Sequence, residues 1–217
     1  MPIVAGASVK APPDKTPDRI AGMFDAIAPR YDLLNHVLSA GIDRRWRARA
    51  IRSLALTGRE TLLDVCTGTA DVALQAVAQQ KGRRGGPSGP PSGVARVIGV
   101  DFAAAMLAFG RRKLRAAGED RRITLVRGDA TRLPLRDGTV DAATVAFGIR
   151  NVDRPELACA EVARVMRRGG RLAILEFGVP RVPGISTLYL WYFKYLLPSV
   201  GRMVSGHTAA YSYLPAS

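Results

Sequence analysis

Short apolar strands alternate with helical stretches through the middle of this chain, and this alternation restricts the folds open to it. Each strand segment is rich in Val, Ile, Leu and Ala, and the longer segments between them suit helices. The expected strands span 61–66, 94–101, 123–128, 140–147 and 170–177, and the expected helices span 71–80, 103–116 and 154–167. This order is typical of an α/β fold, in which helices cover both faces of a parallel sheet. We therefore expect ligands at the carboxyl ends of the strands.

A tract rich in Gly, Pro and Ser, KGRRGGPSGPPSG, lies at 81–93 between the first helix and the second strand. Such a segment has no means of forming a core, so we expect a flexible surface insertion. Asp101 follows Gly68 by 33 residues, whereas the ribose-binding acid of a nucleotide-binding unit follows its glycine loop by about 20. Removing the tract restores that spacing, so we interpret Asp101 as this acid.

The loop after the first strand, CTGTAD, indicates the class of cofactor. A dinucleotide site requires G-x-G-x-x-G, because backbone amides must approach a pyrophosphate. Here Gly68 is followed by Thr69, Ala70 and Asp71, so only one glycine is present. S-adenosylmethionine carries a sulfonium cation and no phosphate, and acidic surroundings suit it. The loop therefore favours S-adenosyl-L-methionine.

Acidic residues follow the first three strands in an order that is typical of class I methyltransferases. The expected cofactor-binding residues include Asp64, Gly68, Asp101 with its neighbour Phe102, and Asp129 with its neighbour Ala130. An ionised carboxylate only accepts hydrogen bonds, so Asp101 can accept from both ribose hydroxyls and Asp129 from the adenine amino group. For Asp64, a role in capping the loop remains the alternative.

Three motifs make the chain similar to one methyltransferase family. MFDAIAPRYDLLN with SAGIDRRW runs from Met23 to Trp46, FGIRN follows the fourth strand, and LEF ends the fifth. They resemble the quinone C-methyltransferases, which methylate the ring in menaquinone and ubiquinone synthesis. The resemblance implies a Rossmann-like fold and cofactor contacts from Thr69, Asp101, Asp129, Ala130 and Ala146. The chain departs from the family pattern at Ala70, which replaces a glycine, and at Ala146, which replaces a common serine.

The resemblance further implies methylation of a ring carbon of a polyprenylated quinol. The expected acceptor is demethylmenaquinol, and a benzoquinol of ubiquinone synthesis is the alternative. Arg150 and Asn151 follow the fourth strand and are the expected catalytic residues, with Arg150 stabilising the phenolate that forms. A surface ion pair between Arg150 and Asp153 is the alternative.

The substrate is expected to lie under an N-terminal lid and beside an aromatic helix. Tyr31 and His36 belong to the lid, and Trp191 and Tyr195 share one face of a helix within 185–200. That face can border an isoprenoid groove or meet a bilayer. Packing of the same helix against the fifth strand is the alternative.

The organisation expected is one domain at 18–217, with a lid at 18–56 and a disordered arm at 1–17. Family members continue past a segment like YSYLPAS, so we expect C-terminal strands to be missing and strand 170–177 to be an open edge. No apolar run reaches the length of a membrane span. The two cysteines lack disulfide or metal spacing, which favours the cytoplasm.

A net charge of +14 points to anionic partners. Arginines cluster at 44–52 and at 111–122, where they can face anionic lipid, nucleic acid or solvent alone. The charge suggests an RNA methyltransferase, but no N-P-P-Y motif follows the fourth strand, so we expect contact with a membrane surface and none with nucleic acid. A non-catalytic cofactor-fold protein is a further alternative, which Asp101, Asp129 and Arg150 oppose. Whether the chain forms a homo-oligomer stays open.

Overall fold

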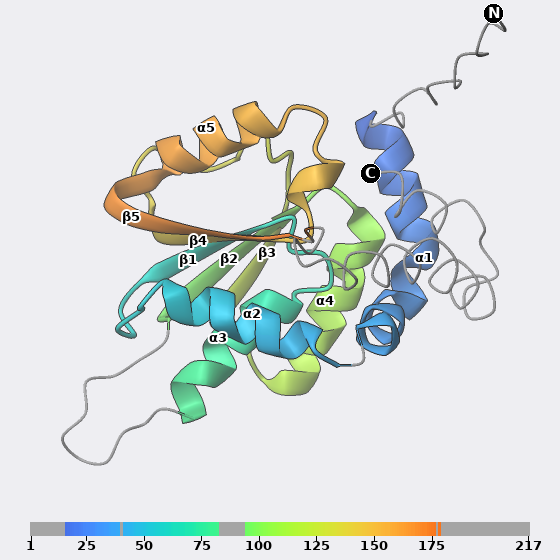
Figure 1. Cartoon of the computed structure of the whole chain (residues 1–217), viewed down its shortest axis with the longest axis horizontal. Helices are drawn as coiled ribbons and strands as arrows, with labels where there is room; N and C mark the ends of the chain where they lie inside the picture. The colour runs from blue at the N-terminus through green and yellow to red at the C-terminus, as the bar shows by residue number, and fades with distance from the viewer. Residues whose placement is uncertain (1–15, 40, 83–93, 177, 179–217) are drawn as a thin grey trace, which may run out of the picture.

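The computed structural model describes residues 16–39, 41–82, 94–176 and 178, and these adopt the expected α/β fold (Figure 1). One parallel sheet has the order β3-β2-β1-β4-β5. Its strands are β1 (Thr61–Val65), β2 (Arg96–Asp101), β3 (Ile123–Arg127), β4 (Val140–Ala146) and β5 (Met166–Leu175). The chain moves outward from β1 to β3 and then crosses to β4 on the other side of β1. Strand order therefore reverses between β1 and β4, where open parallel sheets bind ligands.

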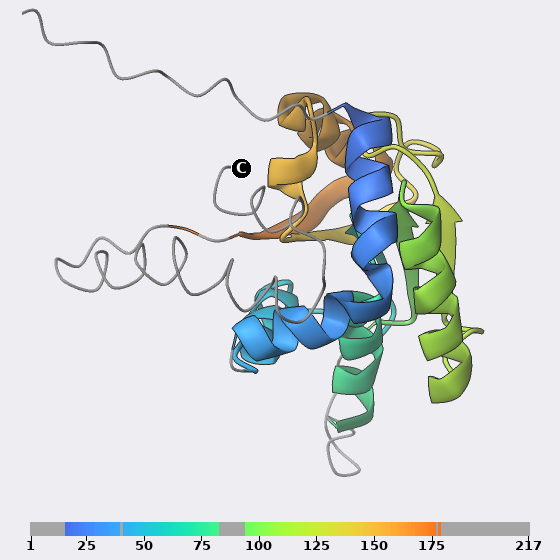
Figure 2. The ribbon, with the colours of Figure 1, turned by 90° about the vertical axis from the view of Figure 1, so that its right-hand side faces the viewer.

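Helices cover both faces of the sheet. The face with α2 (Asp43–Ser53), α3 (Asp71–Gly82) and α4 (Ala104–Ala117) lies opposite the face with α5 (Pro155–Val165). The N-terminal helix α1 (Pro17–Leu38) lies outside this sandwich and runs along α4 (Figure 2). A short 3-10 helix, η1 (Ile149–Asn151), follows β4. The helices α1 and α2 occupy most of the segment expected to form a lid.

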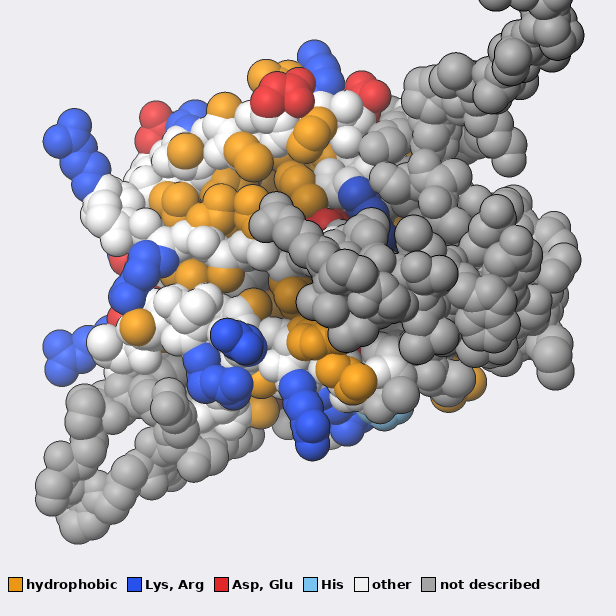
Figure 3. Space-filling view, viewed as in Figure 1, with side chains coloured by type: hydrophobic (Ala, Val, Ile, Leu, Met, Phe, Trp, Pro, Cys, Tyr) orange, Lys and Arg blue, Asp and Glu red, His pale blue; other side chains and the backbone are white. Residues whose placement is uncertain are grey.

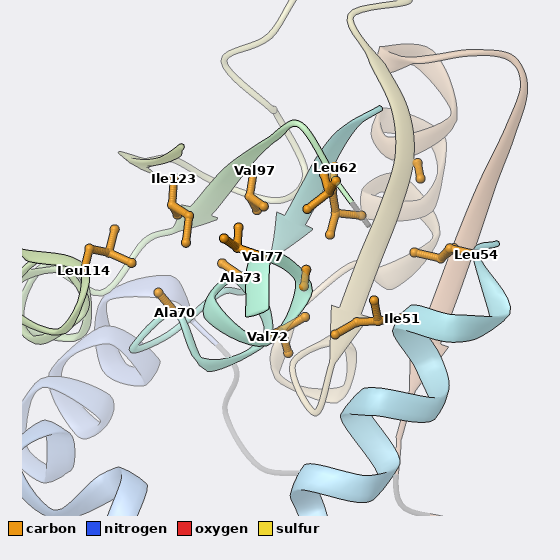
Figure 4. Close-up of a cluster of buried hydrophobic side chains, with 13 residues drawn as sticks. Ile51, Leu54, Leu62, Ala70, Val72, Ala73, Val77, Val97, Leu114 and Ile123 are labelled. Carbon is orange, nitrogen blue, oxygen red and sulfur yellow. The ribbon is translucent and has the colours of Figure 1, made fainter. Parts of the chain in front are cut away.

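The two halves of the core follow from the two-residue period of the strands. On β1, Leu62 points into a cluster with α2 and α3, and this cluster is drawn in Figure 4. The next residue, Leu63, points into the opposite cluster with α5. Both leucines are fully buried, which stabilises the fold by about 1.5–3 kcal/mol each. The apolar run of β1 therefore fixes this strand at the centre of the sheet.

Most element boundaries lie within two residues of the sequence prediction, and the largest difference is at the start of β5. The helix expected to reach residue 167 ends at Val165, and β5 begins at Met166, which pairs with Val140. Gly169 lies inside β5 at φ +80°, and the pairing register shifts there, so glycine marks a bulge and not the start of the strand. The helix α3 continues to Gly82, two residues into the Gly-, Pro- and Ser-rich tract.

Several expectations concern residues outside the described ranges. They are the arm at 1–15, the remainder of the tract at 83–93, and the aromatic helix at 185–200 with Trp191 and Tyr195. Within the described ranges, β5 stands at one end of the sheet and partly exposes Leu172 and Ile174. No helix in the same ranges is long and apolar enough to cross a membrane.

Candidate functional site

The loop that leaves β1 makes a sharp turn at the centre of the sheet edge. Its residues Cys66, Gly68 and Ala70 all have positive φ angles, between +55° and +67°. Glycine adopts this conformation freely, whereas for other residues it costs about 1–3 kcal/mol. Ala70 thus occupies, under strain, a position at which the resembled family has glycine. Ala70 is fully buried and packs toward Gly110 of α4, so its methyl group points away from the open side of the loop.

Asp101 ends β2 directly beside this loop. Its carboxylate accepts hydrogen bonds from the backbone amides of Gly68 at 2.8 Å and Ala103 at 2.9 Å. The side chain is 7% exposed, and burial raises its pKa above the usual value, against the lowering effect of these amides. The structure therefore brings Asp101 to Gly68 across the intervening tract, as the spacing argument predicts.

A partly open pocket, called the cavity below, lies at the carboxyl ends of β1, β2 and β4. Among the residues that line it are six of the predicted site residues: Tyr31, Gly68, Asp101, Phe102, Ala146 and Asn151. The remainder of the lining is apolar, aromatic or glycine, and the described lining contains one carboxylate and no Lys or Arg. A pyrophosphate would find no cation in this lining. S-adenosylmethionine fits it, because its adenine is flat and apolar, its ribose offers two donors and its sulfonium is positive.

Asp64 lies beneath the cavity rather than in its lining. It is 1% exposed and accepts hydrogen bonds from the hydroxyls of Thr67 at 2.6 Å and Thr144 at 2.8 Å. Burial raises the pKa of Asp64 to about 6, although both hydroxyls act to lower it. This geometry is the one expected of the alternative interpretation, in which Asp64 holds the loop.

The segment expected to bind adenine follows β3 and is tied to β2. The amide of Gly128 donates to the carbonyl of Asp101 at 2.9 Å. Asp129 is exposed and caps its own turn by accepting from the amide of Thr131 at 2.8 Å, whereas Ala130 is buried in the core. Neither Asp129 nor Ala130 is among the residues that line the cavity, so their contact with adenine stays a prediction.

Arg150 and Asn151 lie together on η1, at the carboxyl end of β4. Asn151 lines the cavity and donates to the carbonyl of Phe147 at 3.5 Å. The Nε of Arg150 lies 3.6 Å from a carboxylate oxygen of Glu176, and the Arg150 side chain is only 16% exposed. Arg150 is thus a half-buried residue paired with Glu176, and no ion pair with Asp153 is found among the described contacts. Glu176 belongs to the LEF motif at the end of β5, and the motif alone did not predict this contact.

A second group of charged residues lies on the other side of the loop. Lys113 of α4 donates to Asp32 of α1 at 2.7 Å and to the hydroxyl of Thr69 at 3.2 Å, and it also binds Asp71. Thr69 in turn donates to Asp32 at 2.5 Å. Burial alone would raise the pKa of Asp71, but Lys113 and Arg47 outweigh it and hold the pKa below its usual value. Sequence reasoning missed this cluster, because its members come from four separate segments.

The two predicted lid residues face different cavities. Tyr31 lines the cavity beside Gly68, whereas His36 borders a second, more open hollow together with Asp71 and Lys113. One ring nitrogen of His36 lies 3.3 Å from Asp43, and the side chain is 44% exposed. Only Tyr31 is therefore placed to contact a ligand in the first cavity.

Comparisons with known proteins place these features in a family. Residues 13–217 match the sequence profile of the ubiE/COQ5 methyltransferase family. A ubiquinone/menaquinone biosynthesis C-methyltransferase UbiE from Geobacter sp. (strain M21) is 44% identical over 200 residues, covering 92% of this chain and 80% of the relative. A demethylmenaquinone methyltransferase from Thermus thermophilus is 44% identical over 195 residues, covering 90% of this chain and 82% of the relative.

Solved structures with lower sequence identity share the fold. A Methanococcus maripaludis protein assigned to the S-adenosyl-L-methionine-dependent methyltransferases superposes with a TM-score of 0.61 at 18% identity, covering 84% of this chain and 77% of the other. A SAM-dependent methyltransferase from Aquifex aeolicus gives a TM-score of 0.51 at 21% identity, with coverages of 63% and 66%. These likenesses show the fold alone.

Proposed function

Because this chain belongs to the ubiE/COQ5 methyltransferase family, we propose that it methylates a ring carbon of a polyprenylated quinol, with demethylmenaquinol as the acceptor. S-adenosylmethionine, when bound, supplies an electrophilic methyl group. One observation carries the proposal: Asn151 lines the cavity and Arg150 adjoins it on η1, so a cation stands beside the place where a ring would enter. The name of the Thermus relative favours demethylmenaquinol over a benzoquinol.

The proposed cofactor contacts follow from the lining of the cavity. Asp101 keeps carboxylate lone pairs for the ribose hydroxyls beyond those used by Gly68 and Ala103. Phe102 and Ala146 supply apolar surface in the same lining. Asp129 and Ala130 follow Gly128, whose amide binds the carbonyl of Asp101, and they would meet the adenine amino group. For Asp64 and Thr69, the contacts support a role in holding the loop.

Arg150 is proposed to stabilise negative charge on the quinol. A ring carbon becomes nucleophilic when the neighbouring hydroxyl loses its proton, so a phenolate must be favoured. A guanidinium stays protonated at any ordinary pH and cannot easily serve as a base, but its charge stabilises the phenolate. Glu176 forms an ion pair with the largely buried guanidinium and would fix its orientation. Asn151 would help to orient the ring or a water molecule.

Product analysis with both quinol classes tests this function. The protein is incubated with methyl-labelled S-adenosylmethionine and either demethylmenaquinol or a polyprenyl benzoquinol, and the extracted lipid is analysed. We expect label in the naphthoquinol ring at a rate well above that for the benzoquinol. A preference for the benzoquinol would refute the acceptor, and label in neither lipid would refute the function.

We further propose that α2 rests on the anionic inner face of the cytoplasmic membrane, where a polyprenylated quinol is found. The outer side of α2 carries the exposed arginines Arg44, Arg45, Arg49 and Arg52, for which no ion pair is found among the described residues. Lys and Arg side chains gather over this helix in Figure 3. Ile42 and Trp46 are 43% and 37% exposed beside them, so basic and apolar groups share one surface.

The position of Trp46 links this surface to the cavity. Its ring centroid lies 6.5 Å from that of Phe147, which lines the cavity. Each arginine close to an anionic bilayer contributes about 1 kcal/mol of attraction. We therefore expect Arg45→Glu with Arg49→Glu to abolish sedimentation with phosphatidylglycerol vesicles. The matched control, Arg111→Glu with Arg115→Glu on α4, should still sediment, and equal loss in both pairs would refute a specific role for α2.

A further inference from the structure

Tyr31 and Asp32 are neighbours on α1 but lie on opposite sides of the loop between β1 and α3. Tyr31 lines the cavity, and a Cβ atom added to Gly68 would lie 4.0 Å from the Tyr31 ring. The ring also meets Phe24 edge-on, with centroids 5.9 Å apart. Consecutive helical residues point about 100° apart, so the loop fits between the two side chains. The contacts that hold the Asp32 side chain therefore also fix the position of Tyr31 beside Gly68.

Lys113 is the centre of the contacts that hold Asp32. An ammonium group has three N–H donors, and that of Lys113 finds three acceptors: Asp32 at 2.7 Å, Thr69 at 3.2 Å, and Asp71. The three acceptors come from α1, from the loop after β1 and from the start of α3. Thr69 is 2% exposed, whereas Lys113, Asp32 and Asp71 are 29%, 39% and 30% exposed, so the charges lie at the margin of the core.

The same cluster reaches α2 through Asp71. Arg47 donates to Asp71 at 2.8 Å and also binds Asp43, and its side chain is only 10% exposed. Asp71 thus forms ion pairs with Lys113 of α4 and with Arg47 of α2. The helix α1 packs mainly on α4. It is held there by a small apolar contact and by the amide of Ala105, which donates to Asp25 at 2.8 Å, and the contacts of Asp32 add the tie to the loop.

We propose that Lys113 is a positioning residue for cofactor binding, which holds α1 on the loop through Asp32 and Thr69 so that Tyr31 covers the cavity. Lys113 does not line the cavity and touches no residue of its lining in the described contacts. We call α1 closed when it lies on the loop with Tyr31 over the cavity. Lys113 then changes the affinity for the cofactor by changing the fraction of molecules in which α1 is closed. The apparent Kd equals the intrinsic Kd divided by that fraction.

Calorimetric titration with S-adenosylmethionine and with S-adenosylhomocysteine tests the proposal without any quinol. We expect Lys113→Met and Asp32→Asn each to raise both Kd values about tenfold, as for a closed fraction reduced to roughly a tenth. The double variant should be no weaker than either single variant, because both break the same contact. Lys113→Arg keeps the charge and should recover part of the affinity. Arg115→Met, an exposed change on the same helix, is the matched control and should bind normally.

Hydrogen exchange separates positioning from a general loss of structure. In cofactor-free Lys113→Met, amides of α1 should exchange faster, while amides of β1 and β4 keep their protection. In turnover assays the KM for S-adenosylmethionine should rise and kcat at saturation should hold, because saturating cofactor repopulates the closed state. Unchanged Kd values, additive effects in the double variant, or a matching loss of protection in β1 would each overturn the proposal. If Lys113→Met does not fold, the Kd and hydrogen-exchange measurements are made on Asp32→Asn and Lys113→Arg instead.

Discussion

Asp64 makes the stability of this fold depend on pH in an unusual direction, and Asp64→Asn should remove that dependence. In the folded chain the carboxyl releases its proton at about pH 6, whereas an ordinary Asp does so near 3.8. Between these values the folded state binds more protons than the unfolded state, so the free energy of unfolding falls as pH rises. A difference of about two pH units corresponds to about 3 kcal/mol. The contribution is fully present below pH 4 and is lost as pH passes 6.

Urea unfolding followed by circular dichroism between pH 3 and pH 8 measures this effect. An asparagine at position 64 can still form hydrogen bonds with the hydroxyls of Thr67 and Thr144. Its oxygen accepts from one hydroxyl and its NH2 group donates to the other, because a hydroxyl can rotate to donate or accept. We expect the stability of Asp64→Asn relative to the native chain to increase by about 3 kcal/mol from the acid to the neutral end. Asp153→Asn removes one exposed carboxyl and is the control for the general effect of a lost charge on stability. A relative stability of Asp64→Asn that is flat across the series would refute the reasoning.

Two further predictions concern the cofactor and the reaction. Asp101→Ala should weaken S-adenosylmethionine binding on the order of a hundredfold in calorimetry, because it removes charge-assisted hydrogen bonds from a partly dry site; an unchanged Kd would exclude Asp101 from the ribose site. Arg150→Ala should lower kcat about a hundredfold in single-turnover methylation while the cofactor Kd holds, with partial rescue by Arg150→Lys and by raised pH. Glu176→Gln should lower kcat less than Arg150→Ala does. A normal rate and pH profile for Arg150→Ala would place Arg150 outside the reaction.

The fold could be read from the sequence because its signals are local. The strands β1 to β4 are compact and largely apolar, and discounting one low-complexity tract was enough to give the expected spacing between Gly68 and Asp101. The start of β5 was missed because no Gly or Pro separates Val165 from Met166, and only the pairing of Met166 with Val140 ends the helix. Tertiary pairing overrides local preference at such a point.

The partnerships in the site could not be read in this way. Lys113 and Asp32 are 81 positions apart, and both are common residue types on helical surfaces. Which side of α1 meets the loop depends on how the helix packs on α4, and the sequence carries no separate signal for that. Glu176 was visible within a family motif, but its contact with Arg150 could be found only in the three-dimensional structure.

The order of the elements along the chain has a consequence for synthesis on the ribosome. The described residues that line the cavity all lie between Phe24 and Val152, and β1 can pair with β4 only after both strands have been synthesised. Glu176 is translated later than every one of them. A growing polypeptide therefore contains the described lining of the cavity before it contains the counter-ion of Arg150.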